Sequence, residues 1–271
     1  MLYDRELLTL AREAAVLAAK GAGAIIKERF LHAHTVTWKG EEGDLVTEVD
    51  GLSEAYILDR LQTVFPDHAI RSEETGWNGI ENDWLWLVDP LDGTNNYAIG
   101  LPVFGVSLTL IRNNEPMLGV IYEPILDRLY IAEKGRGADL NGERMKPVVD
   151  GKPARKMTVG WIQGHHVQKK QEATSLKHNL DNSFKRVLRL WAPTMQWSAL
   201  ARGELDGIVL YDSEGDDLYS GILLAREAGA VIEDYEGRPF EGMNPEPYII
   251  AAHPSNIGTV RDAVRRAIQT G

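Results

Sequence analysis

The 271-residue chain contains no cysteine, which excludes disulfides, zinc–thiolate sites, iron–sulfur clusters and cysteine nucleophiles. No apolar run approaches the length of about 18 residues that a membrane-spanning helix needs. The N-terminal segment carries acidic side chains and lacks a continuous apolar core, so it does not predict a signal peptide. These absences favour a protein of a reducing compartment, and we expect a cytoplasmic location without membrane contact.

Basic residues are fewer than acidic residues in this chain. The chain has 29 Lys or Arg against 40 Asp or Glu, a net charge of −11, which argues against nucleic-acid binding and is compatible with binding cations. The charge is unevenly distributed, because residues 144–189 hold eleven Lys or Arg against three Asp or Glu. This local excess of +8 predicts two lobes, residues 1–145 and 146–271, within one compact unit.

Hydrophobic spacing predicts a layered α+β fold. Helical periodicity covers residues 6–30 and 52–65, and Pro66 ends the second helix. Apolar runs separated by turn residues then predict an antiparallel meander with strands 84–88, 103–111, 117–122 and 128–133, followed by a glycine-punctuated loop over 134–142. Later segments predict helices over 196–205, 218–228 and 259–270 and strands over 230–234 and 248–252. A helix pair, a run of strands and then mixed elements indicate layers rather than a βαβ repeat.

Two aspartates follow a buried-looking strand. Asp89 is succeeded by Pro90, which we expect to take the chain out of the strand ladder, and Asp92 is succeeded by the turn-forming Gly93. We expect Thr94 to cap the helix that follows. The two carboxylates can therefore converge at one strand end, where sites commonly lie in layered α/β proteins.

Further acidic residues occur in similar settings. Asp50 ends a short strand-like run, Glu73 and Glu74 follow another, and Asp217 begins a helix. Taken singly, such residues are most often turns, caps or solvated surface. Taken together, a set of carboxylates without His or Cys suits Mg²⁺ better than Zn²⁺.

The ordered set of motifs resembles the inositol monophosphatase family of Mg²⁺-dependent, Li⁺-sensitive phosphatases. The segment Asp89-Pro-Leu-Asp-Gly-Thr-Asn-Asn96 resembles the family signature, and the resemblance extends over most of the chain through four further blocks: residues 44–50, 72–74, 135–142 and 217–229. It implies the layered αβαβα sandwich of the inositol monophosphatase and fructose-1,6-bisphosphatase type. It also implies a homodimer that hydrolyses a small phosphorylated metabolite.

The resemblance further implies roles for individual residues. Glu73, Asp89 and the Leu91 carbonyl would bind one Mg²⁺, and Asp89, Asp92 and Asp217 a second. Asp50, with Glu73 acting through water, would support a third, weaker ion. Thr94, paired with Asp50 or another carboxylate, would orient the attacking water. The N–H groups of Gly93 and Thr94 would hold the phosphate, with Lys39 nearby.

The expected substrate pocket departs from the family pattern. Leu210 stands seven residues before Asp217, where inositol-hydrolysing members place a glutamate for a ring hydroxyl. Asp212 or Glu214 could substitute if the loop is rearranged. Trp191 stands where the family has a small residue and offers a flat apolar face. We therefore expect inositol 1-phosphate to be a poor substrate compared with another phosphate monoester.

Several activities stay open at this stage. The central prediction is hydrolysis of a sugar, cyclitol or inositol phosphate by a metal-activated water. Alternatives with the same chemistry are phosphatases for 3′-phosphoadenosine 5′-phosphate or NADP, histidinol phosphate, and fructose 1,6-bisphosphate. An alternative of another class is a regulatory binding protein with the same fold that acts through RNA or the transcription machinery. Only the basic stretch 144–189 favours it.

Overall fold

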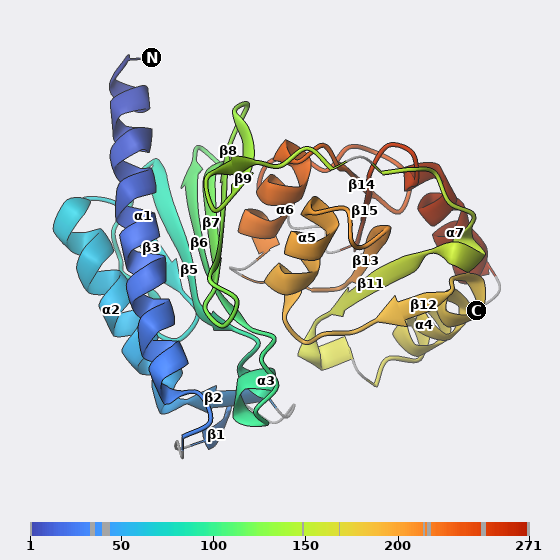
Figure 1. The fold of residues 1–271 in the computed structure, drawn as a ribbon, viewed down its shortest axis with the longest axis horizontal. Coiled ribbons are helices and arrows are strands. Elements are labelled where there is room, and N and C mark those ends of the chain that lie inside the picture. The colour runs from blue at the N-terminus through green and yellow to red at the C-terminus, as the bar shows by residue number, and fades with distance from the viewer. Residues whose placement is uncertain are drawn as a thin grey trace.

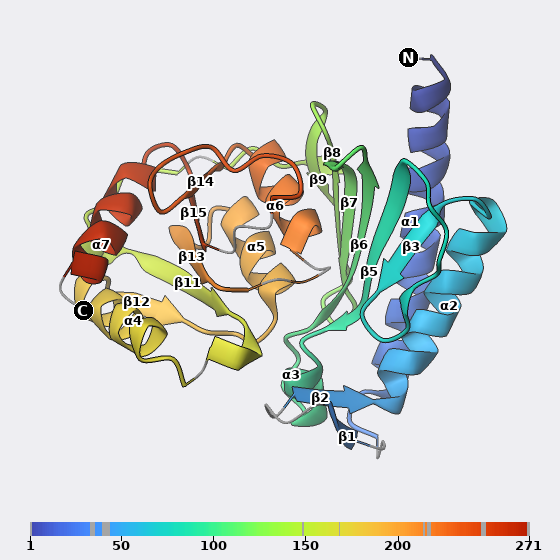
Figure 2. The ribbon, with the colours of Figure 1, turned by 180° about the vertical axis from the view of Figure 1, so that it is seen from behind.

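Helices and sheets alternate in an αβαβα sandwich (Figure 1). Helices α1 (Leu2–Arg29) and α2 (Glu48–Val64) cover one face of an eight-stranded sheet. Helices α5 (Pro193–Ala201) and α6 (Leu218–Glu227) lie between this sheet and a five-stranded sheet, and α4 (Gln171–Ser183) and α7 (Ile257–Gln269) cover the outer face of the second sheet, as Figure 2 shows from behind. The layered α+β fold predicted from the sequence is confirmed.

The computed structural model describes residues 2–32, 36–39, 44–147, 149–167, 169–213, 215, 218–244 and 248–269. None of the helices in these ranges is long and apolar enough to cross a membrane.

The eight-stranded sheet is built mainly from the predicted meander. In spatial order its strands are β10 (Glu143–Arg144), β9 (Gly137–Leu140), β8 (Arg128–Glu133), β7 (Glu115–Glu123), β6 (Gly105–Arg112), β5 (Trp84–Asp92), β3 (Ala69–Ser72) and β4 (Gly76–Trp77). All neighbours pair antiparallel except β3 and β5, which are parallel. A separate hairpin, β1 (Val36–Lys39) with β2 (Asp44–Thr47), precedes α2.

Small residues let α1 and α2 pack closely together and onto this sheet. Ala15, Ala18 and Ala22 of α1 are fully buried in the first core cluster. A Cβ on Gly21 would lie 2.2 Å from the ring of Tyr56, so only glycine allows the two helices to approach this closely. The alanine-rich stripe therefore places α2 directly over β5, the strand that carries the aspartates.

Two strands of the second sheet, β11 and β12, come from the basic stretch 144–189, for which no elements were predicted. Its order is β12 (Arg186–Leu188), β11 (Thr158–Gln163), β13 (Gly207–Tyr211), β15 (Tyr248–Ala252) and β14 (Val231–Asp234). Strands β12, β11 and β13 are parallel to one another, and β15 is antiparallel to both β13 and β14. Two 3₁₀ turns complete this half, Ala154–Lys156 and His165–Val167. The division into lobes at residue 145 stays a prediction.

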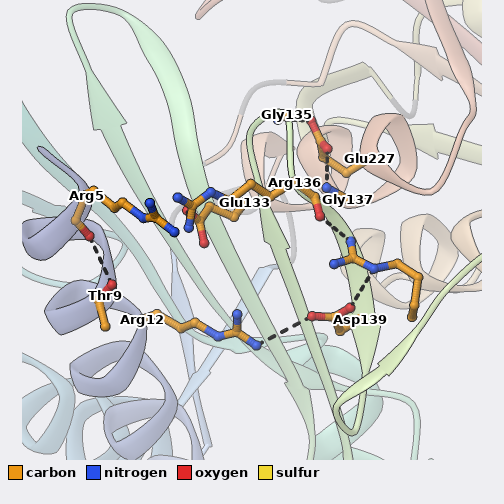
Figure 3. A network of polar contacts seen from close by, with 10 residues as sticks. Arg5, Thr9, Arg12, Glu133, Gly135, Arg136, Gly137, Asp139 and Glu227 are labelled. Atoms are coloured by element: carbon orange, nitrogen blue, oxygen red, sulfur yellow. Dashed lines mark hydrogen bonds and ion pairs between the residues drawn. The ribbon is translucent and has the colours of Figure 1, made fainter. Parts of the chain in front are cut away.

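The glycine-punctuated segment is a hairpin rather than a simple loop. Strand β9 lies inside it, which corrects the prediction of a loop over 134–142. Glu227 of α6 accepts hydrogen bonds from the N–H groups of Gly135 at 2.7 Å and Gly137 at 2.6 Å (Figure 3). On β9, Asp139 contacts Arg12 of α1 at 3.5 Å. The motif blocks 135–142 and 217–229 thus contact each other through Glu227, and this contact joins the middle helical layer to the first sheet.

The other predicted elements differ from the structure mainly at their ends. Helix α5 begins at Pro193 and ends at Ala201, whereas a helix over 196–205 was expected. Proline is favoured at a helix start because it needs no N–H donor there. Strand β5 extends through Asp92, four residues beyond the predicted end.

Candidate active site

A cavity of about 740 Å³ opens between the end of β5 and the segments around β11 and α5. Its wall contains acidic, basic and aromatic side chains. The predicted site residues that line it are Glu73, Asp89, Leu91, Asp92, Gly93, Thr94 and Trp191. The structure thus brings together two of the sequence blocks, residues 72–74 and 89–96, with Trp191.

A β-bulge puts Asp89 and Asp92 on the same side of the sheet. Residues three apart in a regular strand face opposite ways. Here Asp89 pairs with Ser107 and Asp92 with Gly105, so one extra residue of β5 lies between the two pairs. The bulge contains Pro90, which has no N–H to donate to the ladder. Pro90 therefore interrupts the ladder without ending it, which corrects our expectation, and both carboxylates line the cavity.

A glycine turns the chain from β5 into the short helix α3 (Thr94–Ala98). Gly93 has φ = 96°, in the left-handed region, and is the N-cap residue of α3. A Cβ here would lie 2.8 Å from the carbonyl oxygen of Val103. Thr94 is the first helical residue, which corrects its predicted capping role. Its hydroxyl is left to make contacts inside the cavity.

Thr94 and Asp50 form a hydrogen-bonded pair. The Thr94 hydroxyl lies 2.7 Å from Asp50 Oδ1 and 3.0 Å from the Leu91 carbonyl oxygen. Asp50 Oδ2 accepts hydrogen bonds from the Thr47 N–H at 2.9 Å and the Thr47 hydroxyl at 2.5 Å, which forms the capping box of α2. Burial raises the pKa of Asp50, and the hydrogen bonds from Thr47 and Thr94 partly oppose that rise. Such a carboxylate is a suitable proton acceptor.

Two further polar residues of α2 hold the backbone around the cavity. Ser53 donates a 2.7 Å hydrogen bond to the Pro90 carbonyl oxygen in the bulge. Glu54 Oε1 accepts from the N–H groups of Glu74 at 3.2 Å and Thr75 at 3.0 Å, and from the Thr75 hydroxyl at 3.2 Å. Both residues are buried. Because Asp50, Ser53 and Glu54 share one helix face, α2 positions Thr94, the bulge and the turn after Glu73 together.

Asp92 is buried, and among the described residues no basic side chain forms an ion pair with it. Its Oδ2 accepts hydrogen bonds from the N–H of Thr194, at 2.9 Å, and from the Thr194 hydroxyl. Burial raises the pKa of Asp92 to about 7, the Thr194 hydrogen bonds oppose the rise, and the negative charge of Glu73 adds to it. Thr194 belongs to α5, so this contact joins the middle helical layer to β5.

The donor chemistry of the cavity fits a hard divalent cation. Glu73, Asp89 and Asp92 supply carboxylate oxygens, and no described lysine or arginine forms an ion pair with the buried Asp92. Such oxygen donors suit Mg²⁺. Within the described ranges, no three Asp, Glu or His side chains are close enough together to hold a metal ion. Asp217 lies outside the described residues, as does the side chain of Lys39.

Leu210 is a core residue and does not line the cavity. It is 1% exposed and packs in the second core cluster beneath α5 and α6. Its backbone pairs with Ile162 and Ile249 in the middle of the five-stranded sheet. A count of residues back from Asp217 cannot show which way position 210 faces, and here the side chain faces the core. The argument from Leu210 against inositol 1-phosphate therefore has no structural basis.

The proposed substitutes for that glutamate are also constrained. Asp212 makes ion pairs with Lys170 at 2.6 Å and His166 at 3.2 Å. These contacts lower the pKa of Asp212, with the Lys170 hydrogen bond as the largest cause. Glu214 lies outside the described residues. Asp212 is thus held by Lys170 and His166, and His166 lines the cavity.

Trp191 lines the cavity as expected, but one of its ring faces is covered. The guanidinium carbon of Arg189 lies 3.8 Å from the centre of the Trp191 ring. Sequence reasoning missed this arginine and also missed Thr194, Ser53 and Glu54. A Thr, Ser or Glu inside a helix carries no distinctive local signal, and only the folded contacts show what these residues hold.

Comparisons with known proteins agree with this architecture. The chain is 34% identical over 233 residues to a fructose-1,6-bisphosphatase/inositol-1-monophosphatase of Aquifex aeolicus, covering 84% of this chain and 86% of that protein. It is also 34% identical over 230 residues to Nus factor SuhB of Escherichia coli strain K12, covering 82% of this chain and 84% of that protein.

Solved structures show the same fold. The extragenic suppressor protein SuhB of Bartonella henselae superposes with a TM-score of 0.84 at 28% identity, covering 96% of this chain and 99% of that one. Inositol monophosphatase from Anabaena superposes with a TM-score of 0.80 at 28% identity, covering 97% of this chain and 96% of that one. The inositol monophosphatase family model matches residues 8–269. The chain belongs to the inositol monophosphatase family.

Proposed function

We propose that the protein is a Mg²⁺-dependent phosphatase that hydrolyses a small phosphate monoester, such as a sugar, cyclitol or inositol phosphate. The observation that carries the proposal is the arrangement at the end of β5. Two carboxylates on a bulge, Asp89 and Asp92, share a cavity with Glu73 and with Thr94, whose hydroxyl is hydrogen-bonded to Asp50. Membership of the family supports the same chemistry.

The cation would be held by oxygen ligands from the first sheet and the loop before α6. Glu73, Asp89, Asp92, Asp217 and the Leu91 carbonyl are the proposed ligands, with Asp50 as a contributor to a third and weaker ion. When bound, Mg²⁺ lowers the pKa of a coordinated water and neutralises charge on phosphate oxygens.

Thr94 and Asp50 would handle the proton of the attacking water. The Thr94 hydroxyl donates toward Asp50 Oδ1, so its oxygen lone pair can accept a proton from water as its own proton passes to Asp50. The water oxygen then bonds to phosphorus, the ester P–O bond breaks, and the leaving oxygen takes a proton from solvent water and departs as the alcohol. The raised pKa of Asp50 favours its role as the final acceptor.

The phosphate would be held at the start of α3. Gly93 brings the backbone close to the cavity wall, and the N–H groups of Gly93 and Thr94 lie at the beginning of the helix. Such N–H groups bind anions. Lys39 would add a positive charge near this point.

The proposal is tested by phosphate release from purified protein. A panel of inositol 1-phosphate, sugar phosphates, histidinol phosphate, fructose 1,6-bisphosphate, NADP and 3′-phosphoadenosine 5′-phosphate would be assayed with Mg²⁺ and with excess chelator. We expect at least one member to be hydrolysed with Mg²⁺, hydrolysis to stop in chelator, and Ca²⁺ and Li⁺ to inhibit. Chelator-insensitive turnover would contradict the proposal.

The second candidate is a regulatory role through RNA or the transcription machinery. The observation that favours it is the 34% identity to Nus factor SuhB, equal to that of the enzyme from Aquifex aeolicus. The basic stretch gives it less support than its charge suggests. Four of its basic residues form ion pairs with acids: Arg144 with Asp139, Lys152 with Asp206, Lys170 with Asp212 and Lys177 with Asp181.

The two candidates predict different outcomes. Salt-dependent RNA binding by the wild-type protein, without release of phosphate from any member of the panel, would favour the regulatory role. Mg²⁺-dependent hydrolysis without RNA binding would favour the enzyme.

A further inference from the structure

Arg189 lines the cavity and makes no ion pair with any acidic side chain among the residues that the structure describes. Its side chain lines the same cavity as Asp89, Asp92 and Thr94. One of its terminal nitrogens, Nη2, is buried and has no hydrogen-bond partner within the described ranges. Buried donors are almost always paired in folded proteins, because leaving one unpaired costs free energy. A purely structural arginine would be expected to reach a carboxylate or carbonyl oxygen, as Arg261 does with Glu233 at 2.5 Å.

The stack on Trp191 holds the guanidinium group in place. The Arg189 guanidinium carbon lies 3.8 Å from the ring centre, which is well within the range of a cation–π contact. Trp191 itself has φ = 52°, a left-handed conformation that is unfavourable for a bulky residue. Strained residues of this kind tend to occur at ligand sites, where the surrounding contacts fix them.

Two contacts place this segment relative to the acidic residues. Asn96 of α3 donates a 2.6 Å hydrogen bond to the Leu190 carbonyl oxygen. Four residues further on, the Thr194 N–H donates to Asp92 Oδ2 at 2.9 Å. The backbone between Arg189 and Thr194 is therefore attached to both α3 and β5. The guanidinium group is held in a set position relative to the carboxylates that would bind the cation.

We infer that Arg189 binds a second phosphate group of the substrate, on the part of the molecule that is not being hydrolysed. This inference rests on the proposed function. A guanidinium group presents a planar fork of N–H donors that matches phosphate oxygens, and it keeps its charge when partly buried. Arg71 and His166 line the same cavity and add to its basic character. The second phosphate would supply the acceptors that Arg189 lacks among the described residues.

Steady-state kinetics on a matched pair of substrates tests the inference. Fructose 1,6-bisphosphate and fructose 1-phosphate differ only in the second phosphate. We expect kcat/KM of the wild type to favour the bisphosphate by about tenfold or more, as loss of a charge-assisted contact usually costs that much. In Arg189→Gln, the ratio of the two kcat/KM values should fall about 10- to 100-fold, mainly through KM of the bisphosphate. The ratio in Arg189→Lys should lie between that of the wild type and that of Arg189→Gln.

The matched control is Arg186→Gln. Arg186 is exposed on β12, three residues earlier, and does not line the cavity. Its substitution should leave the ratio unchanged. A ratio that is unchanged in Arg189→Gln, or equal losses on both substrates, would overturn the inference. A second pair of substrates, 3-phosphoglycerate and glycerol 3-phosphate, tests for a carboxylate in place of the second phosphate. If kcat/KM favours 3-phosphoglycerate as strongly as it favours the bisphosphate in the first pair, the site binds any anion and the assignment to phosphate is wrong.

A binding measurement separates this inference from the proposed function. Calorimetry would compare methylene phosphonate analogues of the same two esters, which cannot be hydrolysed. We expect the wild type to bind the bisphosphonate about tenfold more tightly, and Arg189→Gln to lose that difference. Absence of catalysis with the binding difference intact would refute only the phosphatase. Equal binding of the two analogues by the wild type would refute the role of Arg189.

Discussion

Thr94 Oγ1 lies 2.7 Å from Oδ1 of Asp50, a residue 44 positions earlier in the chain. The contact crosses from α3 to the first turn of α2, where Asp50 also closes the capping box with Thr47. The same carboxylate thus stabilises a helix start and orients the hydroxyl at the candidate active site. Its two oxygens have separate partners, so Thr94 can be changed without removing the cap.

Replacing the Thr94 hydroxyl should abolish most of the activity while the fold survives. Thr94→Val keeps the shape but cannot transfer a proton, and we expect kcat to fall by about 10²- to 10⁴-fold, the usual contribution of a general base. Thr94→Ser keeps the hydroxyl and should retain most of the turnover. Phosphate-release kinetics would check both variants, with thermal unfolding as the control. A Val variant within about threefold of the wild type would contradict the role of Thr94.

Removing the Glu54 carboxylate should loosen the turn that carries Glu73. In Glu54→Leu, the N–H groups of Glu74 and Thr75 lose their acceptor. We expect a loss of about 1–3 kcal/mol in the free energy of unfolding and a higher Mg²⁺ concentration for half-maximal activity. Denaturant unfolding and Mg²⁺ titration measure the two effects.

Two variants serve as references for Glu54. Glu54→Gln retains an amide oxygen as an acceptor, so its free energy of unfolding and its Mg²⁺ requirement should lie between those of the wild type and Glu54→Leu. Glu48→Gln alters an exposed residue at the start of the same helix and should change little. If Glu54→Leu needs no more Mg²⁺ than the wild type, Glu54 does not position the ligand loop.

Cation binding should strengthen as the pH rises through about 7. Burial raises the pKa of Asp92 to about 7 in the metal-free protein, so its proton must leave before a cation binds. The folded-state pKa of Asp92 lies above its unfolded value. The associated stabilisation is therefore fully present below the unfolded pKa and is lost as the pH rises through about 7. Mg²⁺ should restore stability mainly at the alkaline end.

Thermal unfolding across this pH range, with and without Mg²⁺, measures the effect. Thr194→Val removes the side-chain hydrogen bond that lowers the pKa of Asp92 and should move the transition to higher pH. Thr194→Ser should behave as the wild type. Mg²⁺ stabilisation that is independent of pH between about 6 and 8 would show that Asp92 does not control cation binding.

Placing a carboxylate at position 210 should damage the fold rather than alter substrate choice. Leu210 is 1% exposed among apolar side chains, so Leu210→Glu would bury a charge without a partner. We expect a loss of about 3 kcal/mol or more in unfolding free energy. Leu210→Met, which conserves volume, should lose less than about 1.5 kcal/mol. A stable Glu variant that gains turnover of inositol 1-phosphate would show that position 210 faces the substrate.

Local patterns in the sequence predicted the first half of the fold well. The alanine-rich period of α1 and the turn residues between β6, β7 and β8 act through near neighbours, so they can be recognised without tertiary information. The second sheet was harder to predict. Strands β11 and β12 are short and lie in a stretch where charge obscures the apolar pattern. They pair with each other, and β11 also pairs with β13 far along the chain.

The candidate site was predictable only where its residues lie close together in the sequence and share one chemistry, as the carboxylates of the 89–96 motif do. The motif at residues 89–96 pointed to the carboxylates, but the bulge at Pro90 depends on the pairing of β5 with β6. Leu210 was misplaced because a residue count does not tell which face of a strand a side chain occupies, and Leu210 faces the core. Arg189 was missed because its significance lies in what it does not contact, which requires the folded structure.

The most direct test of the account is the phosphatase activity of Asp89→Asn. Asp89 lies 5% exposed on the bulge and is the proposed ligand common to two cations, so losing its charge weakens both sites. We predict that the purified variant unfolds at about the same temperature as the wild type and loses more than about 10³-fold of its Mg²⁺-dependent phosphate release. A variant that keeps more than about a tenth of wild-type turnover, a change worth only about 1.4 kcal/mol, would contradict the central claim.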